Sequence, residues 1–356
     1  RAFVTAQTFL PVELVFNPNW WHAAAGISFE EDFYLDAATR IRDDVTMRRV
    51  LHERYSALGL GEADPQPRPI IGSLFVAGGF AIPALLGAHI RFGKDAAPQP
   101  EPCHLSAEQI DAFEKPDWRN MWPMNRLMAD MDALEKQYGC VVGDLNTDGI
   151  LNAAYHLYGQ DLYADFYAAP ERARRFLDQI GELIVEVAEY IHSRTNSYSI
   201  SVNRMAGQLS PAPFIHANCS VQMISPKSYH ALQLPIEEKM AKRMQPYGIH
   251  HCGSNTHVIA AEYARLPLAY VEAGWGSDAA RCRGLLPDAF LNLRLSPVRM
   301  LNCSPREIAA DTSDLLRAAQ PLDRVGICCI NMDAGTPDEN IFAMFEVIER
   351  YRRYGA

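Results

Sequence analysis

The stretch with the clearest capacity for chemistry is Tyr247–Asn255, which reads YGIHHCGSN. In an extended strand, residues two apart point to the same face, so His250 and Cys252 can aim at one point. An imidazole nitrogen and a thiolate are donors that zinc favours, and Gly253 lets the chain turn sharply just beyond them. The pattern therefore indicates a zinc site. It also fits a buried cysteine beside a hydrogen-bonded histidine, and this alternative stays open.

Two more soft donors, Cys328 and Cys329, stand in the β-like run 325–332, just before the helix start at Thr336-Pro337. Strand alternation sends neighbouring side chains to opposite faces, so one ligand and one packed thiol are the simplest expectation. The alternative is that both thiols fill the core as small hydrophobic groups.

The elements that must position these donors follow an alternating pattern. Short apolar, β-rich runs recur between helical stretches, which is typical of a parallel α/β sheet. Several runs are apolar throughout, as expected for strands that are covered on both faces. The predicted strands span residues 69–76, 140–145, 215–224, 248–253, 268–275, 291–301 and 325–332.

Helix signals lie between these runs. A helix begins at Pro170, and its apolar stripe consists of Phe176, Ile180, Ile184, Val187 and Ile191. Other helices are predicted after Ser225-Pro226, Ser304-Pro305 and Thr336-Pro337. We predict one domain over residues 1–356, a (β/α)₈ TIM barrel with a mostly helical N-terminal extension over about residues 1–65. The carboxyl ends of barrel strands carry the active site, so both donor pairs should reach the same rim.

Composition excludes several classes of protein. The chain has 356 residues, and its net charge of -10 gives no reason to expect nucleic acid as a partner. No apolar run approaches the roughly 20 residues of a membrane helix. Eight cysteines without the spacing of a small disulfide scaffold favour reduced thiols and a cytoplasmic protein. The absence of a basic-then-apolar leader disfavours a processed secretory form.

The order of these motifs resembles a known family. H-x-C-G, a late strand ending in cysteine, T-P-x-E-N and the I-S-P segment at Ile224 are together similar to the uroporphyrinogen decarboxylase superfamily, especially its zinc-dependent methyltransferase branch. The resemblance runs from about His216 to the end of the chain. It implies methyl transfer between a corrinoid partner protein, which carries methylcobalamin, and a small thiol or tetrahydrofolate-type acceptor. A homodimer is common in the superfamily.

The resemblance also implies a ligand set. His250 and Cys252 match the H-x-C pair, and Cys329 is the better match for a third ligand. Because its spacing to the T-P motif is one residue longer than in the family pattern, Cys328 or both thiols remain alternatives. His216 stands where some relatives have an acidic residue, so it is a candidate fourth ligand; otherwise it binds substrate or hydrogen-bonds a ligand.

Two other functions remain open. One is a cofactor-free decarboxylase of the same superfamily, which is disfavoured because the early region 19–26 lacks an Arg-rich motif for substrate carboxylates. The other is a non-catalytic barrel that binds a metal or a corrinoid.

Polar and aromatic residues near predicted strand ends complete the candidate site. Asp278 and Asp333 could also have simpler roles, in capping the next helix and in a turn respectively. The catalytic candidates are Asn218, Asp278 and Asp333, and the cofactor-binding candidates are Asp144, Gln222 and Trp275.

Overall fold

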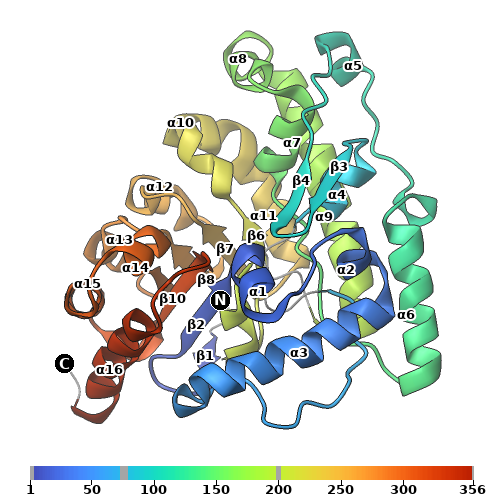
Figure 1. The fold of residues 1–356 in the computed structure, drawn as a ribbon. Coiled ribbons are helices and arrows are strands. Elements are labelled where there is room, and N and C mark those ends of the chain that lie inside the picture. The colour runs from blue at the N-terminus through green and yellow to red at the C-terminus, as the bar shows by residue number, and fades with distance from the viewer. Residues whose placement is uncertain (1–3, 73–78, 198–201, 355–356) are drawn as a thin grey trace.

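The computed structural model describes residues 4–72, 79–197 and 202–354, and its centre is a curled, fully parallel sheet (Figure 1). The strand order is β2-β10-β9-β8-β7-β6, and helices cover the outside of the sheet. The strands are β2 (Val12–Phe16), β6 (Phe214–Ala217), β7 (Tyr247–His251), β8 (Leu268–Ala273), β9 (Phe290–Arg294) and β10 (Val325–Met332).

Two extended segments outside the six-stranded sheet pair with each other, and one of them reaches the edge strand β6. Ile70 forms a parallel bridge with Val142. The second segment continues to Gly149, where a Cβ atom would lie 1.7 Å from the carbonyl oxygen of Ala217 in β6, so only glycine allows this approach. The architecture is that of the predicted (β/α)₈ barrel. Of the predicted strand 69–76, residues 73–76 lie outside the described part of the chain.

The predicted strands β8 and β10 form where the apolar runs placed them, but two predicted strands end early. The run 215–224 turns after Ala217 into the 3₁₀ helix η4 (Cys219–Met223). The run 291–301 becomes helix α14 (Pro297–Asn302), because Ser296 accepts a hydrogen bond from the Arg299 amide and caps the helix ahead of a proline.

The first barrel strand lies inside the expected N-terminal helical extension. Helices α2 (Glu31–Leu35) and α3 (Ala37–Tyr55) form there as expected, but β2 pairs with β10 and belongs to the sheet. The strand was hidden because it is short and carries a charge at its second residue. Glu13 points into the barrel, where Asn292 donates to its carboxylate at 2.8 Å.

The long helices match their predicted stripes. All five apolar residues of α9 (Pro170–Thr195) are buried, and α15 (Pro305–Ala318) begins with a capping box between Ser304 and Glu307. The other helices are α1 (Pro18–Ala25), α4 (Ala81–Leu85), α5 (Ala107–Asp111), α6 (Met124–Tyr138), α7 (Ile150–Tyr158), α8 (Asp161–Ala168), α10 (Pro226–Ser228), α11 (Leu234–Arg243), α12 (Thr256–Tyr263), α13 (Ala279–Leu285) and α16 (Asp338–Tyr354).

Two small antiparallel pairs decorate the barrel. Strands β1 (Thr5–Ala6) and β5 (Leu209–Ser210) pair with each other, and β3 (Ile90–Gly93) pairs with β4 (Ala96–Pro100). Within the described ranges, no helix is long and apolar enough to span a membrane.

Alternation gives each barrel strand two different faces. In β7, Tyr247 and Ile249 belong to the large core between sheet and helices. The intervening residues of β7 point into the barrel, and Ile215 of β6 packs there against Tyr270 and Phe290. The same parity places His250 and Cys252 inside.

Candidate metal centre

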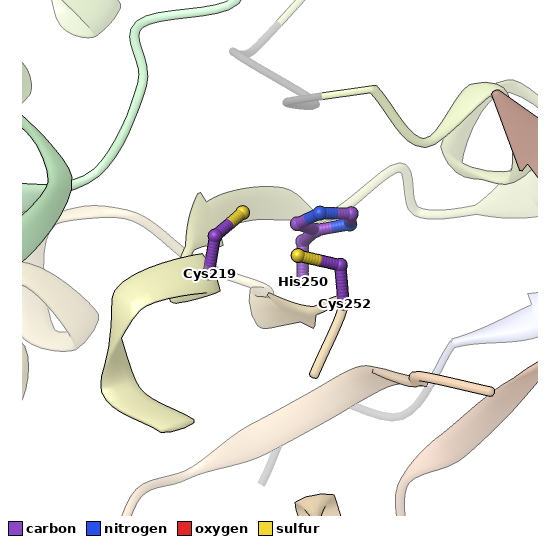
Figure 2. Close-up of side chains that lie close together, drawn as sticks. All are labelled: Cys219, His250 and Cys252. Carbon is purple, nitrogen blue, oxygen red and sulfur yellow. The ribbon is translucent and has the colours of Figure 1, made fainter. Parts of the chain in front are cut away.

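Three soft donors meet at the carboxyl ends of β6 and β7. The ligand atoms of Cys219, His250 and Cys252 all lie within 4.8 Å of one another, and Figure 2 shows both sulfur atoms beside the imidazole ring. His250 is the fourth residue of β7, Cys252 follows the strand directly, and Cys219 opens η4. The sheet thus positions two of the donors, and the turn after β6 brings the third.

Close packing of three successive loops supports this arrangement. A Cβ atom at Gly253 would lie 2.6 Å from the Gln222 side chain, and one at Gly274 would lie 2.2 Å from the Gly253 carbonyl oxygen. Only glycine fits at both positions. The loops after β6, β7 and β8 are therefore stacked around Cys252.

The orientation of the His250 ring is fixed from within the barrel. Its Nδ1 atom contacts the Glu272 carboxylate, and it lies 2.9 Å from the Asn203 side-chain oxygen. Asn203 in turn donates to Glu272 at 2.7 Å. A proton on Nδ1 leaves Nε2 as the nitrogen available to a metal. Such a carboxylate–histidine pair commonly supports metal-binding histidines.

Glu272 remains ionised although it is fully buried. Burial alone would raise its pKa, but the charges of His250 and Arg294 outweigh burial and lower it to about 2. Arg294 donates to Glu272 at 3.2 Å and to the Ile330 carbonyl oxygen at 3.1 Å. Burial likewise opposes the charged form of His250, but Glu272 and Cys252 together raise the pKa of the imidazole to about 10.

The two thiols shift each other's pKa in opposite directions. A hydrogen bond from Cys219, assisted by His250 and by the charge of Arg294, lowers the pKa of Cys252 to about 4 against the effect of burial. The same hydrogen bond, together with burial, raises the pKa of Cys219. Cys252 is thus prepared as an anionic ligand at neutral pH.

This donor set fits zinc. Two sulfur atoms and one imidazole nitrogen are soft and borderline donors of the kind that bind Zn²⁺, and three protein ligands leave a fourth tetrahedral position for a substrate. The Glu272 contact supplies the usual support for the histidine.

The cysteine pair of β10 lies apart from these donors. Cys329 packs in the core between sheet and helices, whereas Cys328 faces the barrel interior with Val15 and Ile330. Neither joins the group around His250 in the described residues. Alternation separates the two thiols as expected, but it turns Cys329, the favoured third ligand, away from the site. Cys219 occupies the place beside the H-x-C pair instead.

His216 also lies on the opposite face from the metal group. Its Nε2 atom accepts a hydrogen bond from the Ile150 amide at 3.1 Å, and its Nδ1 atom lies 3.4 Å from the Glu237 carboxylate of α11. Nε2 is therefore engaged in a hydrogen bond, and Nδ1 faces a carboxylate without forming one. Strand parity explains the placement, because His216 and Asn218 face the helices, whereas Ile215, Ala217 and Cys219 face the barrel interior.

The catalytic candidates have structural contacts. Asn218 is buried on the helix side of β6, where it donates to Glu237 at 2.8 Å. Asp278 is exposed and caps α13 by accepting from the Arg281 amide at 2.9 Å. Asp333 accepts hydrogen bonds from Asn17 and Asn19, which follow β2. Helix capping, the simpler alternative for Asp278, is what the structure shows.

The three cofactor-binding candidates lie in different places relative to the metal group. Gln222 lies over Gly253, next to the metal group, and Trp275 is 45% exposed in the loop after β8. Asp144 is buried away from the group; it pairs with Arg204 at 3.2 Å and lines a cavity of about 30 Å³, which has room for a single water molecule.

The sequence did not single out Cys219 as a ligand candidate and did not identify Glu272, Arg294 or Asn203. Two signals were present. Glu272 is the one charge in the otherwise apolar strand LAYVEA, and such a charge requires a buried partner. Cys219 has the strand parity that faces the barrel, whereas His216 has the opposite parity.

The comparisons with known proteins agree with this fold. The chain matches the family Uroporphyrinogen decarboxylase (URO-D) over residues 77–351, well over half its length, and it therefore belongs to that family. A methyltransferase from Methanosarcina mazei has a similar structure, with a TM-score of 0.65 and 15% identity over 96% of this chain and 94% of that one.

A second similar structure is a B12-independent methionine synthase from Shewanella sp. W3-18-1 in complex with selenomethionine. Its TM-score is 0.51, with 12% identity over 96% of this chain and 98% of that one. No curated protein matches the sequence. At these identities the two structures establish the shared barrel fold.

Proposed function

We propose that the protein is a zinc-dependent methyltransferase that moves a methyl group between a corrinoid protein and a thiol or tetrahydrofolate-type acceptor. The observation that carries this proposal is the convergence of Cys219, His250 and Cys252 at the carboxyl ends of the barrel strands. That end of a (β/α)₈ barrel is where catalytic groups are found.

The chain's own residues would act mainly as ligands and as their supports. Cys219, His250 and Cys252 would hold the ion, with Glu272 keeping the Nδ1 proton of His250 in place. When bound, zinc supplies the positive charge that keeps a substrate thiol deprotonated at neutral pH. The burial of His250 and Glu272 limits water at the base of the site, which strengthens these electrostatic contacts.

The names of the two similar structures support the proposal. The one from Methanosarcina mazei is named a methyltransferase, and the Shewanella protein is named a methionine synthase that does not depend on B12. The second name gives a reason to test a methylated tetrahydrofolate as donor besides methylcobalamin.

A cofactor-free decarboxylase is the second candidate, because the chain belongs to the URO-D family. The two thiols and the imidazole at the strand ends favour the transferase. A decarboxylase that needs no cofactor has no use for a metal-ligand set supported by a buried carboxylate.

The test combines zinc content with methyl transfer. The full chain is purified, its zinc is quantified, and methyl transfer from methylcobalamin or methyltetrahydrofolate to a small alkyl thiol is followed by the change in cobalamin absorbance or by product formation. We expect about one zinc ion per chain, and turnover that is lost in Cys252→Ser. Cys103→Ser is the matched control, since Cys103 lies outside the metal group.

Three outcomes would count against the proposal. Protein without zinc whose His250→Ala and Cys252→Ser variants keep full activity would exclude the metal-dependent reaction. Carbon dioxide release from a carboxylated substrate without metal would favour the decarboxylase. Zinc binding without turnover for any donor and acceptor would favour a non-catalytic barrel.

A further inference from the structure

A buried polar cluster lies on the outer face of β6 and β7, directly behind the metal group. Its centre is Glu237 of α11, which is fully buried. Asn218 and Gln233 donate to Glu237 Oε1 at 2.8 and 2.7 Å, and the Tyr229 hydroxyl donates to Oε2 at 2.9 Å. Four polar side chains thus meet in a region otherwise filled by apolar core.

The side chains around Glu237 all direct N–H or O–H groups at its carboxylate. Because the Ile150 amide donates to His216 Nε2, the proton of His216 lies on Nδ1, which faces Glu237 at 3.4 Å. With the donors from Asn218, Gln233 and Tyr229, this surrounds the carboxylate with hydrogen atoms. A carboxylate accepts the three hydrogen bonds from Asn218, Gln233 and Tyr229 and attracts the His216 N–H by its charge, whereas an amide in the same place would direct its own NH₂ group at a donor.

One member of the cluster connects it to the metal group. Asn218 directly precedes Cys219 and is the N-cap residue of η4, where an asparagine side chain would usually cap the helix. It makes no capping hydrogen bond and turns to Glu237 instead. Its backbone amide donates to the His250 carbonyl oxygen at 2.7 Å. Asn218 is therefore fixed both to α11 and to β7.

The helical segment that carries the cluster contains an irregular turn, which helps to bring its polar side chains to Asn218. A single π-helical turn covers Tyr229–Gln233 just before α11. It brings Tyr229, Gln233 and Glu237, which are four residues apart, onto one side facing Asn218. Turns of this type are rare and are often found near functional sites.

We infer that Glu237 is a positioning residue for the metal centre: through the Asn218 side chain it holds the Cys219 thiol beside His250 and Cys252. The inference rests on the proposed zinc site and adds to it the group that keeps the third ligand in place. Neither Glu237 nor Asn218 contacts the metal group with its side chain, since both lie on the outer face of the sheet.

The experiment uses cobalt(II), whose thiolate charge-transfer absorbance reports how many sulfur ligands bind. The metal-free full chain is titrated with Co²⁺ in the wild type, in Glu237→Gln and in Asn218→Ala. We expect two-thiolate intensity in the wild type and about half of it in both variants, and zinc affinity reduced about 10- to 100-fold, as for other supporting groups of metal ligands. Asn218→Ala provides an independent test should Glu237→Gln not fold.

Asp165→Asn is the matched control, because Asp165 is also a buried carboxylate that accepts from a tyrosine hydroxyl, that of Tyr158 at 2.7 Å, but it lies in α8. It should keep the full absorbance. A folded Glu237→Gln or Asn218→Ala protein with wild-type intensity and affinity overturns the inference and leaves the zinc site standing. A wild-type chain that binds no cobalt overturns the zinc site, and the inference with it.

Discussion

Strands β7 and β10 both carry soft metal donors, yet only the donors of β7 reach a common point; Cys328 and Cys329 lie in the middle of β10. His250 and Cys252 are separated by one residue and share the inner face, and Cys219 joins them from β6. Cys328 and Cys329 are adjacent, so one faces the barrel and the other the helices. Beyond them the pairing of β10 with β2 shifts register between Ile330 and Met332. Spacing and parity, more than residue type, decide which thiols can bind a metal.

The electrostatic surroundings of the β7 thiol and the β10 thiols also differ. At β7, the hydrogen bond from Cys219 and the charges of His250 and Arg294 favour a thiolate at Cys252. At β10, burial raises the pKa of Cys329 to about 12, so this thiol stays protonated. The comparison yields four predictions.

The largest expected effect is the loss of zinc when the donors of β7 are removed, compared with removal of the β10 thiols. His250→Ala and Cys252→Ser should lose stoichiometric zinc, because a site with two protein ligands binds weakly. The double variant with Cys328→Ser and Cys329→Ser should keep its zinc. Metal analysis of dialysed protein checks this. Loss of zinc from the β10 variant alone would reverse the assignment.

The second prediction concerns pH and the metal-free protein. Alkylation of Cys252 by iodoacetamide should be nearly independent of pH above neutrality and should fall only as pH drops through about 4, because thiolate is the reactive form. Cys329 should stay unreactive until the pH approaches 12. Mass spectrometry of the modified peptides after short exposures at several pH values measures both. Equal reactivity of the two thiols at pH 6 would be incompatible with the structure.

The third prediction tests the support of His250. Glu272→Gln removes the charge that holds the Nδ1 proton, so zinc affinity should fall about 10- to 100-fold. Glu186→Gln is the control: Glu186 is a partly buried carboxylate that accepts from Trp118 at 3.0 Å, away from the metal group. Competition with a chromogenic chelator gives the affinities. An unchanged affinity in Glu272→Gln would show that the carboxylate does not serve the ligand.

The smallest effect is expected at the rim. Asp278→Ala removes the cap of α13 and should lower the free energy of unfolding by about 1 kcal/mol, without changing zinc content. Denaturant titration checks the first part and metal analysis the second. A large loss of zinc or of turnover would restore Asp278 as a functional residue.

Much of the fold could be predicted, because apolar runs and helix stripes are local patterns. Strand β10 and helix α9 lie where those patterns placed them. Strand β2 was missed because Glu13 breaks its apolar run, and the partner that makes its burial tolerable, Asn292, is distant in sequence. Local patterns do not report such long-range pairs.

The site was predictable to the extent that its donors share one strand. The H-x-C pair is a local signal, and parity alone fixes its direction. The place of Cys219 depends on where β6 ends and how η4 turns, and the role of Glu272 depends on pairing between β7 and β8. Both depend on contacts between residues that are distant in sequence. Similarity of motif order favoured Cys329, but one additional residue in β10 changes the face on which a thiol lies.

The most direct test of the central claim is X-ray absorption at the zinc edge. For the zinc-loaded wild type, the claim predicts two sulfur ligands and one imidazole nitrogen from the protein, with one sulfur lost in Cys219→Ser and none lost in Cys329→Ser. A sulfur count that is unchanged in Cys219→Ser but reduced in Cys329→Ser would contradict it.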